Sequence, residues 1–181
     1  GLGSGPEPVY GLFLGGGAVI QGTEYAHEKI HSKGLRDGFS LALSTARTVW
    51  GVLRGDPRFN RHVTIDVGLD GGAVQRYDTL ILAASTLQRL SFGMRPFWGQ
   101  GPGAIRLTLF EQDCTRFART FVSIARGRPN RNAVPASGYR SYNATTLHLA
   151  LEAKLNLDGE ILDVSGPLQI SHSAPLAFLA L

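Results

Sequence analysis

The sequence predicts a mainly β domain with a few peripheral helices (α+β), built as an antiparallel β-sandwich. Three observations predict this fold class. The 181 residues include 23 glycines and 9 prolines, which favour many turns and short strands over a helical bundle. Hydrophobic residues make up 43% of the chain and charged residues 18%, which is enough for a sizeable core. Most apolar segments are short and are bounded by turn residues, as strands are.

The N-terminal third predicts one strand followed by two helices. Residues 9–14 are a short apolar run typical of a buried strand, and the three glycines at 15–17 predict a tight turn with close backbone approach. Residues 23–32 suit a helix. Residues 39–53 carry apolar side chains at helical spacing, and Gly55-Asp56-Pro57 ends this second helix.

The middle of the chain changes to a period of two. Val63, Ile65 and Val67 alternate with polar neighbours, Asp70-Gly71-Gly72 predicts a hairpin turn, and residues 79–84 predict the returning strand. This part of the chain therefore predicts a β-hairpin.

A further strand and a third helix follow. Residues 104–109 predict a strand with Ile105, Leu107 and Leu109 on one face. Residues 115–125 predict a helix, and residues 126–136 a polar, basic loop. The side chains expected to point inward from the helix are Phe117, Phe121, Val122 and Ala125.

The remainder predicts strands separated by turns. Turns are expected at Asp158-Gly159, Gly166-Pro167 and Ala174-Pro175. The predicted strands cover residues 145–150, 153–157, 160–164, 168–171 and 176–179.

Composition also limits the setting of the protein. No apolar run approaches the ~20 residues of a spanning helix, and no signal-peptide pattern occurs. The single cysteine, Cys114, has no partner for a disulfide or a metal, so we expect a reducing, cytoplasmic compartment. A net charge of +4 favours peripheral contact with an anionic inner membrane face, although such an excess is more often a solvated surface. We expect no nucleic-acid partner. The oligomeric state stays open, and a start at Gly1 without Met suggests a fragment or processed product.

One motif points to another class of enzyme, and two common nucleotide-binding motifs are absent. His27, Glu28 and His31 form an H-E-x-x-H pattern on a predicted helix, which is the spacing of a zinc hydrolase. No further acid or histidine follows at a suitable spacing. The glycines at 15–17 do not fit G-x-G-x-x-G, and the chain has no P-loop lysine motif. If the protein handles a nucleotide, the main phosphate cradle therefore lies outside this chain.

Aromatic and basic residues gather in the segment 85–99. Phe97 and Trp98 lie between Pro96 and Gly99, so their rings either fold down as a lid on the core or line an apolar site. Arg89 and Arg95 nearby could contact an anionic headgroup.

The stretch Asp158-Gly159-Glu160 carries two adjacent carboxylates. An Asp-Gly turn between strands is first of all a hairpin signal. The second carboxylate adds the alternative of binding a cation, or of serving as base and metal ligand in phosphoryl transfer.

The C-terminal third resembles the closing segment of the diacylglycerol kinase and sphingosine kinase family of lipid kinases. The resemblance rests on Leu155-Asn156-Leu157-Asp158-Gly159-Glu160, on Gly166-Pro167 with the residues after it, and on the apolar run after Pro175. It implies a two-domain enzyme in which an N-terminal α/β domain binds ATP through a G-G-D-G-T motif. That motif is absent here, so residues 1–181 are expected to form the C-terminal β-sandwich domain alone.

The resemblance also implies roles for particular residues. Asp158 becomes the candidate general base for a lipid hydroxyl, Glu160 the ligand at the Mg²⁺–phosphate end, and Gly159 a contact to the nucleotide. Substrate contacts are expected from Arg89, Arg95, Phe97 and Trp98. The family's paired aspartates for a structural metal have no counterpart in residues 95–108, and Glu111 and Asp113 nearby do not match the pattern. A lipid- or protein-binding module without kinase activity remains an alternative, as does the zinc hydrolase.

Overall fold

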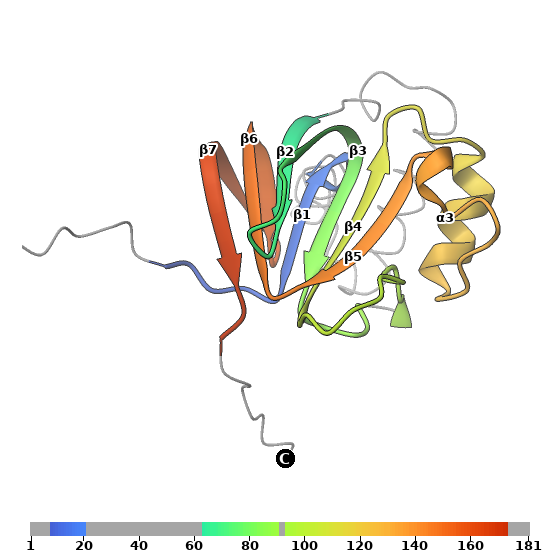
Figure 1. The fold of residues 1–181 in the computed structure, drawn as a ribbon, viewed down its shortest axis with the longest axis horizontal. Helices are drawn as coiled ribbons and strands as arrows, with labels where there is room; N and C mark the ends of the chain where they lie inside the picture. Colours follow the sequence, from blue (N-terminus) through green and yellow to red (C-terminus); the bar gives the residue numbers. More distant parts are fainter. Residues whose placement is uncertain (1–7, 21–62, 91–92, 174–181) are drawn as a thin grey trace, which may run out of the picture.

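The computed structural model describes residues 8–20, 63–90 and 93–173. It confirms a mainly β domain with peripheral helices (Figure 1). The predicted helices at 23–32 and 39–53, the predicted strand at 176–179 and the Ala174-Pro175 turn lie outside the described residues, and so do His27, Glu28 and His31. The described elements are β1 (Phe13–Gly17), β2 (Val63–Leu69), β3 (Gln75–Ser85), β4 (Ile105–Glu111), α3 (Phe117–Ala125), the 3₁₀ turn η2 (Pro135–Ser137), β5 (Tyr139–Ala144), β6 (Thr146–Leu157) and β7 (Glu160–Ser171).

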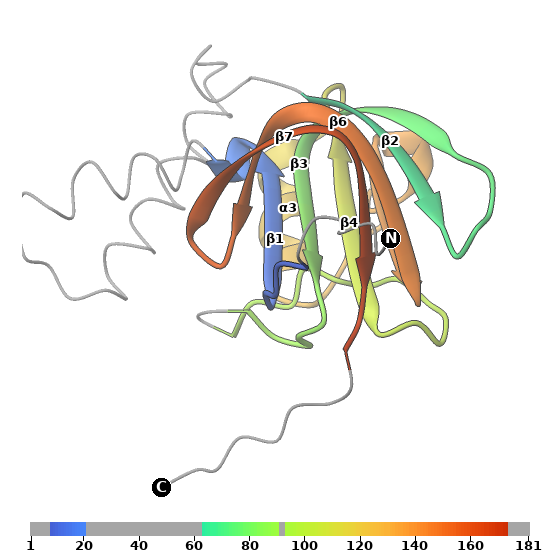
Figure 2. The same cartoon turned by 90° about the vertical axis from the view of Figure 1, so that its left-hand side faces the viewer.

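All seven described strands belong to one antiparallel sheet. β1 and β2 lie end to end between β3 and β6. β2 pairs with residues 75–79 of β3 and 147–150 of β6, and β1 pairs with residues 81–85 and 155–157 of the same two strands. The sheet is strongly bent, so that β6 and β7 arch across the face of β1, β3 and β4 (Figure 2). The predicted sandwich is therefore a single sheet folded over on itself.

The larger core lies between the two halves of this bent sheet. Leu107 on β4 and Leu147 and Leu149 on β6 are almost completely buried in it, and each such side chain stabilises the fold by roughly 1.5–3 kcal/mol. The predicted inward face of Ile105, Leu107 and Leu109 is confirmed, since all three belong to this core. Strict alternation along the strands is what places them on one face.

A second, smaller core lies between the outer face of the sheet and α3. The ring of Phe110 on β4 meets the ring of Phe121 at 6.1 Å and that of Tyr139 at 5.0 Å, both edge to face. The predicted inward face of the helix was wrong at Val122, which is 40% exposed. Thr120 and Ile124 are the helical residues that are fully buried, and Ile124 lies one turn beyond Phe121 on the same side.

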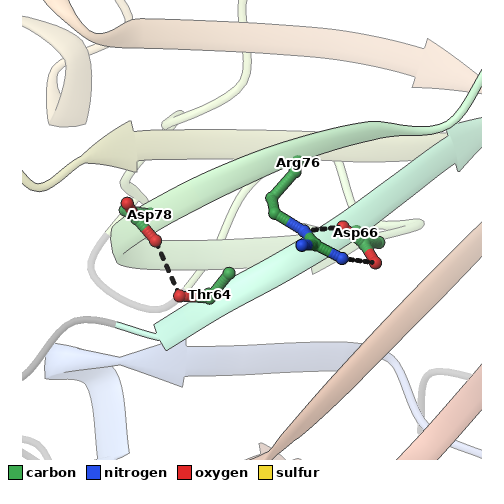
Figure 3. A network of polar contacts seen from close by, with 4 residues as sticks. All are labelled: Thr64, Asp66, Arg76 and Asp78. Atoms are coloured by element: carbon green, nitrogen blue, oxygen red, sulfur yellow. Dashed lines mark hydrogen bonds and ion pairs between the residues drawn. The ribbon is translucent and has the colours of Figure 1, made fainter.

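The outer face of the β2–β3 hairpin carries two polar pairs directly across the strands (Figure 3). The Arg76 guanidinium donates to both carboxylate oxygens of Asp66, at 2.7 and 2.9 Å, and Thr64 donates to Asp78 at 2.6 Å. The hydrogen bonds from Arg76 hold the pKa of Asp66 below its ordinary value. The predicted hairpin is confirmed with its turn at Asp70-Gly71-Gly72, and its second strand begins at Gln75, before the predicted start at Thr79.

The glycine run at 15–17 belongs to β1, so the predicted turn there was wrong. The close backbone approach was right. Gly17 has φ +66°, and a Cβ there would lie 2.3 Å from the carbonyl oxygen of Leu80. Gly17 is therefore required by its close approach to the backbone of β3.

The C-terminal strands are longer and fewer than predicted. Segments 145–150 and 153–157 form the single strand β6, and segments 160–164 and 168–171 form the single strand β7. The turn predicted at Gly166-Pro167 was wrong, because β7 pairs only with β6 among the described strands and proline is tolerated on such an edge. β5 was not predicted at all, since its sequence Tyr-Arg-Ser-Tyr-Asn-Ala does not resemble an apolar strand.

Candidate functional site

The Asp158-Gly159 turn joins β6 to β7, as the sequence predicts. Leu157 and Glu160 are paired across it. Asp158 has φ +50° and Gly159 φ +104°, so both residues adopt conformations that few side chains accept. Aspartate is among the few non-glycine residues that enter the left-handed region readily. The turn sequence is therefore explained by backbone geometry before any chemistry is considered.

The Asp158 carboxylate binds the beginning of β1. One oxygen, Oδ2, accepts the N–H of Leu12 at 2.7 Å, and the other, Oδ1, accepts the N–H of Phe13 at 2.8 Å. The N–H of Asp158 donates in turn to the Phe13 carbonyl at 3.0 Å. Sequence analysis missed this role, because the partners are 145 and 146 residues apart along the chain. Asp158 thus fastens β1 to the end of β6.

Asp70 repeats the same arrangement at the end of β2. It also has φ +50°, and its Oδ1 accepts the N–H groups of Thr145 and Thr146 at 2.7 and 2.8 Å. Its own N–H donates to the Thr146 carbonyl at 3.0 Å. In both turns an aspartate after a strand binds the first residues of the next strand in the sheet. Both Asp-Gly turns among the described residues therefore have a structural function.

A chain of hydrogen bonds leads from Asp158 to the segment after β3. The Leu12 carbonyl accepts the Ser85 hydroxyl at 2.7 Å, and Ser85 Oγ accepts the N–H of Leu87 at 3.0 Å. Arg89 lies two residues further on and is exposed. The Asp158-Gly159-Glu160 turn and the start of the segment that carries Arg89 are thus connected through the first residues of β1.

The other predicted substrate residues are anchored elsewhere. The N–H of Arg95 donates to the Ala125 carbonyl at the end of α3, and the N–H of Trp98 donates to Ser141 Oγ on β5 at 3.1 Å. Trp98 packs against the second core, and Phe97 is half-buried. The sequence left open whether these rings cover the core or line an apolar site, and Trp98 covers the core. The predicted substrate set is therefore divided between two parts of the fold.

Glu160 is exposed at the first position of β7. The described residues contain no group of three or more histidines, cysteines, aspartates or glutamates that could hold a metal ion. A void of about 10 Å³ lies between β1 and β2, and a surface cavity of about 610 Å³ lies beside α3, but neither is lined by Asp158 or Glu160. The candidate site is accordingly an open edge with two neighbouring carboxylates.

The described part of the chain has no helix with the length and apolar character needed to cross a membrane. No protein-family profile matches the sequence, and no curated protein matches it.

Solved structures do match the fold. One is a "putative diacylglycerol kinase" from Bacillus anthracis str. Sterne, with a TM-score of 0.56 and 12% identity over 90% of this chain and 50% of that one. Another structure described in the same words, from the same organism, has a TM-score of 0.50 and 9% identity with the same coverage. Identities this low show the fold alone. The chain therefore has the fold found in these two proteins and spans about half the length of each.

Proposed function

We propose that this chain is the C-terminal domain of an ATP-dependent lipid kinase of the diacylglycerol kinase type. The observation that carries the proposal is the fold match over 90% of the chain to two structures, each described as a "putative diacylglycerol kinase". The Asp158-Gly159-Glu160 turn with Gly166-Pro167 after it supports the same assignment from the sequence. The other half of such an enzyme would bind ATP, and this half would close the cleft over the lipid.

Transfer of phosphate to a lipid hydroxyl requires a proton acceptor and compensation of phosphate charge. Each Asp158 oxygen accepts one backbone N–H and keeps a further lone pair, so the carboxylate can still take the hydroxyl proton. Gly159 has open space around it, since a Cβ there would have no neighbour within 4 Å. A nucleotide held by the other domain could therefore approach this turn closely.

Mg²⁺ would fit this turn only if the phosphates of the substrate supplied its other ligands. Carboxylate oxygens are the ligands it prefers, and protein sites often give it one or two carboxylates plus substrate phosphates. Glu160, exposed two residues after Asp158 in the sequence, fits the place of one such ligand. When bound, Mg²⁺ would offset charge on the phosphates. Arg89, close along the chain to the hydrogen bonds that lead from Asp158, is the best placed of the predicted residues to contact an anionic headgroup.

The test uses this chain and the longer protein that contains it. We expect ATP-dependent phosphorylation of diacylglycerol from a protein that joins a G-G-D-G-T domain to this chain. We expect none from the 181 residues alone, because the nucleotide would have no phosphate cradle. Phosphorylation by the isolated chain would contradict the division into halves, and an inactive longer protein that binds ATP would contradict kinase function.

A binding module without kinase activity is the second candidate. It is favoured by one observation: Asp158 makes the same backbone contacts as Asp70, so its presence can be explained without catalysis. An upstream sequence without G-G-D-G-T, together with lipid binding in the absence of ATP, would support it over the kinase.

A further inference from the structure

The segment from residue 115 to residue 140 is basic throughout. It contains six arginines and no aspartate or glutamate. Arg140 is paired with Glu111, so its charge is offset within the domain. Among the described residues, Arg119, Arg126 and Arg128 have no acidic partner. Positive charge is therefore left unbalanced along α3 and the loop after it.

These arginines share the outer side of α3. Phe117, Phe121 and Ile124 pack against the sheet, so positions 119, 122 and 126 face away from it. In Figure 1 the helix lies at the side of the sheet, next to β4 and β5. Three arginines and Val122, which is 40% exposed, are among the residues that line the open cavity of about 610 Å³. We call Arg119, Val122, Arg126 and Arg128 the α3 arginine surface.

The loop after the helix is fixed in place. The N–H of Arg128 donates to the Ser123 carbonyl at 3.0 Å, and the Ser123 hydroxyl donates to the Arg128 carbonyl. Gly127 between them has φ +70°. Arg126 and Arg128 are therefore held on either side of a defined turn beside the cavity.

The helix dipole does not account for this pattern. A cation near a helix C-terminus is favourable, which would explain Arg126. Arg116 and Arg119 lie at the N-terminal end of α3, where a positive charge is unfavourable. The dipole therefore explains Arg126 but neither Arg116 nor Arg119.

We propose that the α3 arginine surface docks on an anionic phospholipid bilayer. Guanidinium groups bind phosphate oxygens through paired hydrogen bonds, and an open basic surface with one exposed apolar side chain suits a layer of headgroups. Single-stranded nucleic acid fits less well, because the aromatic rings of α3 that could stack on bases, Phe117 and Phe121, are turned to the core. The proposal rests on charge and shape and not on kinase activity.

Vesicle sedimentation without ATP tests it. The 181-residue chain should bind vesicles of phosphatidylcholine with phosphatidylglycerol, should bind pure phosphatidylcholine vesicles far less, and should be released by salt. The double variant Arg119→Gln/Arg126→Gln should lower the partition onto anionic vesicles roughly thirtyfold, at about fivefold for each arginine removed. Arg128→Gln, which leaves the helix itself unchanged, should lower it about fivefold.

The control removes the same net charge elsewhere. Arg106 on β4 and Lys154 on β6 lie outside α3, so Arg106→Gln/Lys154→Gln should lose clearly less binding than the α3 pair. If both double variants lost the same amount of vesicle binding, the protein would be attracted by its net charge alone and the proposal would be wrong. No preference for anionic vesicles would overturn it, and so would tighter binding of a single-stranded RNA that Arg119→Gln/Arg126→Gln abolishes.

Discussion

At the level of single residues, the Asp-Gly turns at 70–71 and 158–159 are similar in structure. Asp70 and Asp158 share φ +50° and a carboxylate that accepts two backbone N–H groups of a neighbouring strand. We expect Asp70→Ala and Asp158→Ala each to lower the free energy of unfolding by about 2 kcal/mol, since both lose these acceptors and place alanine in the left-handed region. Urea denaturation measures this. Glu152→Ala, on the exposed side of β6, is the control and should change it by less than about 0.5 kcal/mol.

Glu160 offers a cleaner test of catalysis than Asp158. In Asp158 each oxygen accepts a different N–H, so Asp158→Asn would turn an amide group toward a donor and disturb the strand as well. Glu160 is exposed at the edge of the sheet. If the chain belongs to the proposed kinase, we expect Glu160→Gln in that longer protein to lower turnover at least about tenfold, because the proposed metal–phosphate end loses a charge, with thermal stability unchanged.

Steady-state assays with diacylglycerol and ATP check this, at a temperature where both proteins are folded. Asp163→Asn, an exposed acid further along β7, is the control and should keep full turnover. Full turnover in Glu160→Gln as well would remove Glu160 from the proposed site.

At the level of strands and helices, prediction succeeded where a local pattern decides the structure. The β2–β3 hairpin, β4 and α3 all follow from periodicity and turn residues. β5 could not be found in this way, because its fully buried residues Tyr139 and Ala144 are at its two ends and Arg140, Ser141 and Asn143 lie between them. β7 was divided at Gly166-Pro167 because the sequence does not reveal that this strand lies at an edge.

The candidate site shows the same limit. The Asp158-Gly159 hairpin could be predicted from its two residues. Its bonds to Leu12 and Phe13 could not, since they depend on which strands become neighbours in the sheet. The sequence offered one indication: aspartate in an Asp-Gly turn readily adopts positive φ, and its carboxylate commonly accepts hydrogen bonds from backbone N–H groups.

Gly17 tests how closely β1 and β3 must approach. Gly17→Ala would place Cβ 2.3 Å from the Leu80 carbonyl oxygen, whereas Gly71→Ala at φ +75° meets no atom within 4 Å. We expect Gly71→Ala to cost about 1 kcal/mol from backbone strain alone, and Gly17→Ala at least about 3 kcal/mol. Unfolding in urea gives both values. Equal losses would mean that β1 can move away from β3 without cost.

At the level of the whole molecule, burial of tyrosine links folding to alkaline pH. Tyr77 belongs to the larger core, and burial raises its pKa to about 12. Burial also raises the pKa of Tyr139 in the second core. Both folded-state pKa values exceed the value of about 10 expected in the unfolded chain. Below pH 10 or so these groups are neutral in both states, and their full contribution to stability is present.

Stability must therefore fall as the pH rises above about 10, because only the unfolded chain then releases these protons. For Tyr77 alone the loss should approach 1.4 kcal/mol per pH unit, until the pH reaches the folded-state value of about 12. Urea denaturation across this range should show a shallower slope for Tyr77→Phe than for the unaltered chain. Tyr10→Phe is the control, since that ring is 79% exposed and should leave the slope unchanged. The same slope in all three proteins would mean that the larger core opens before Tyr77 titrates.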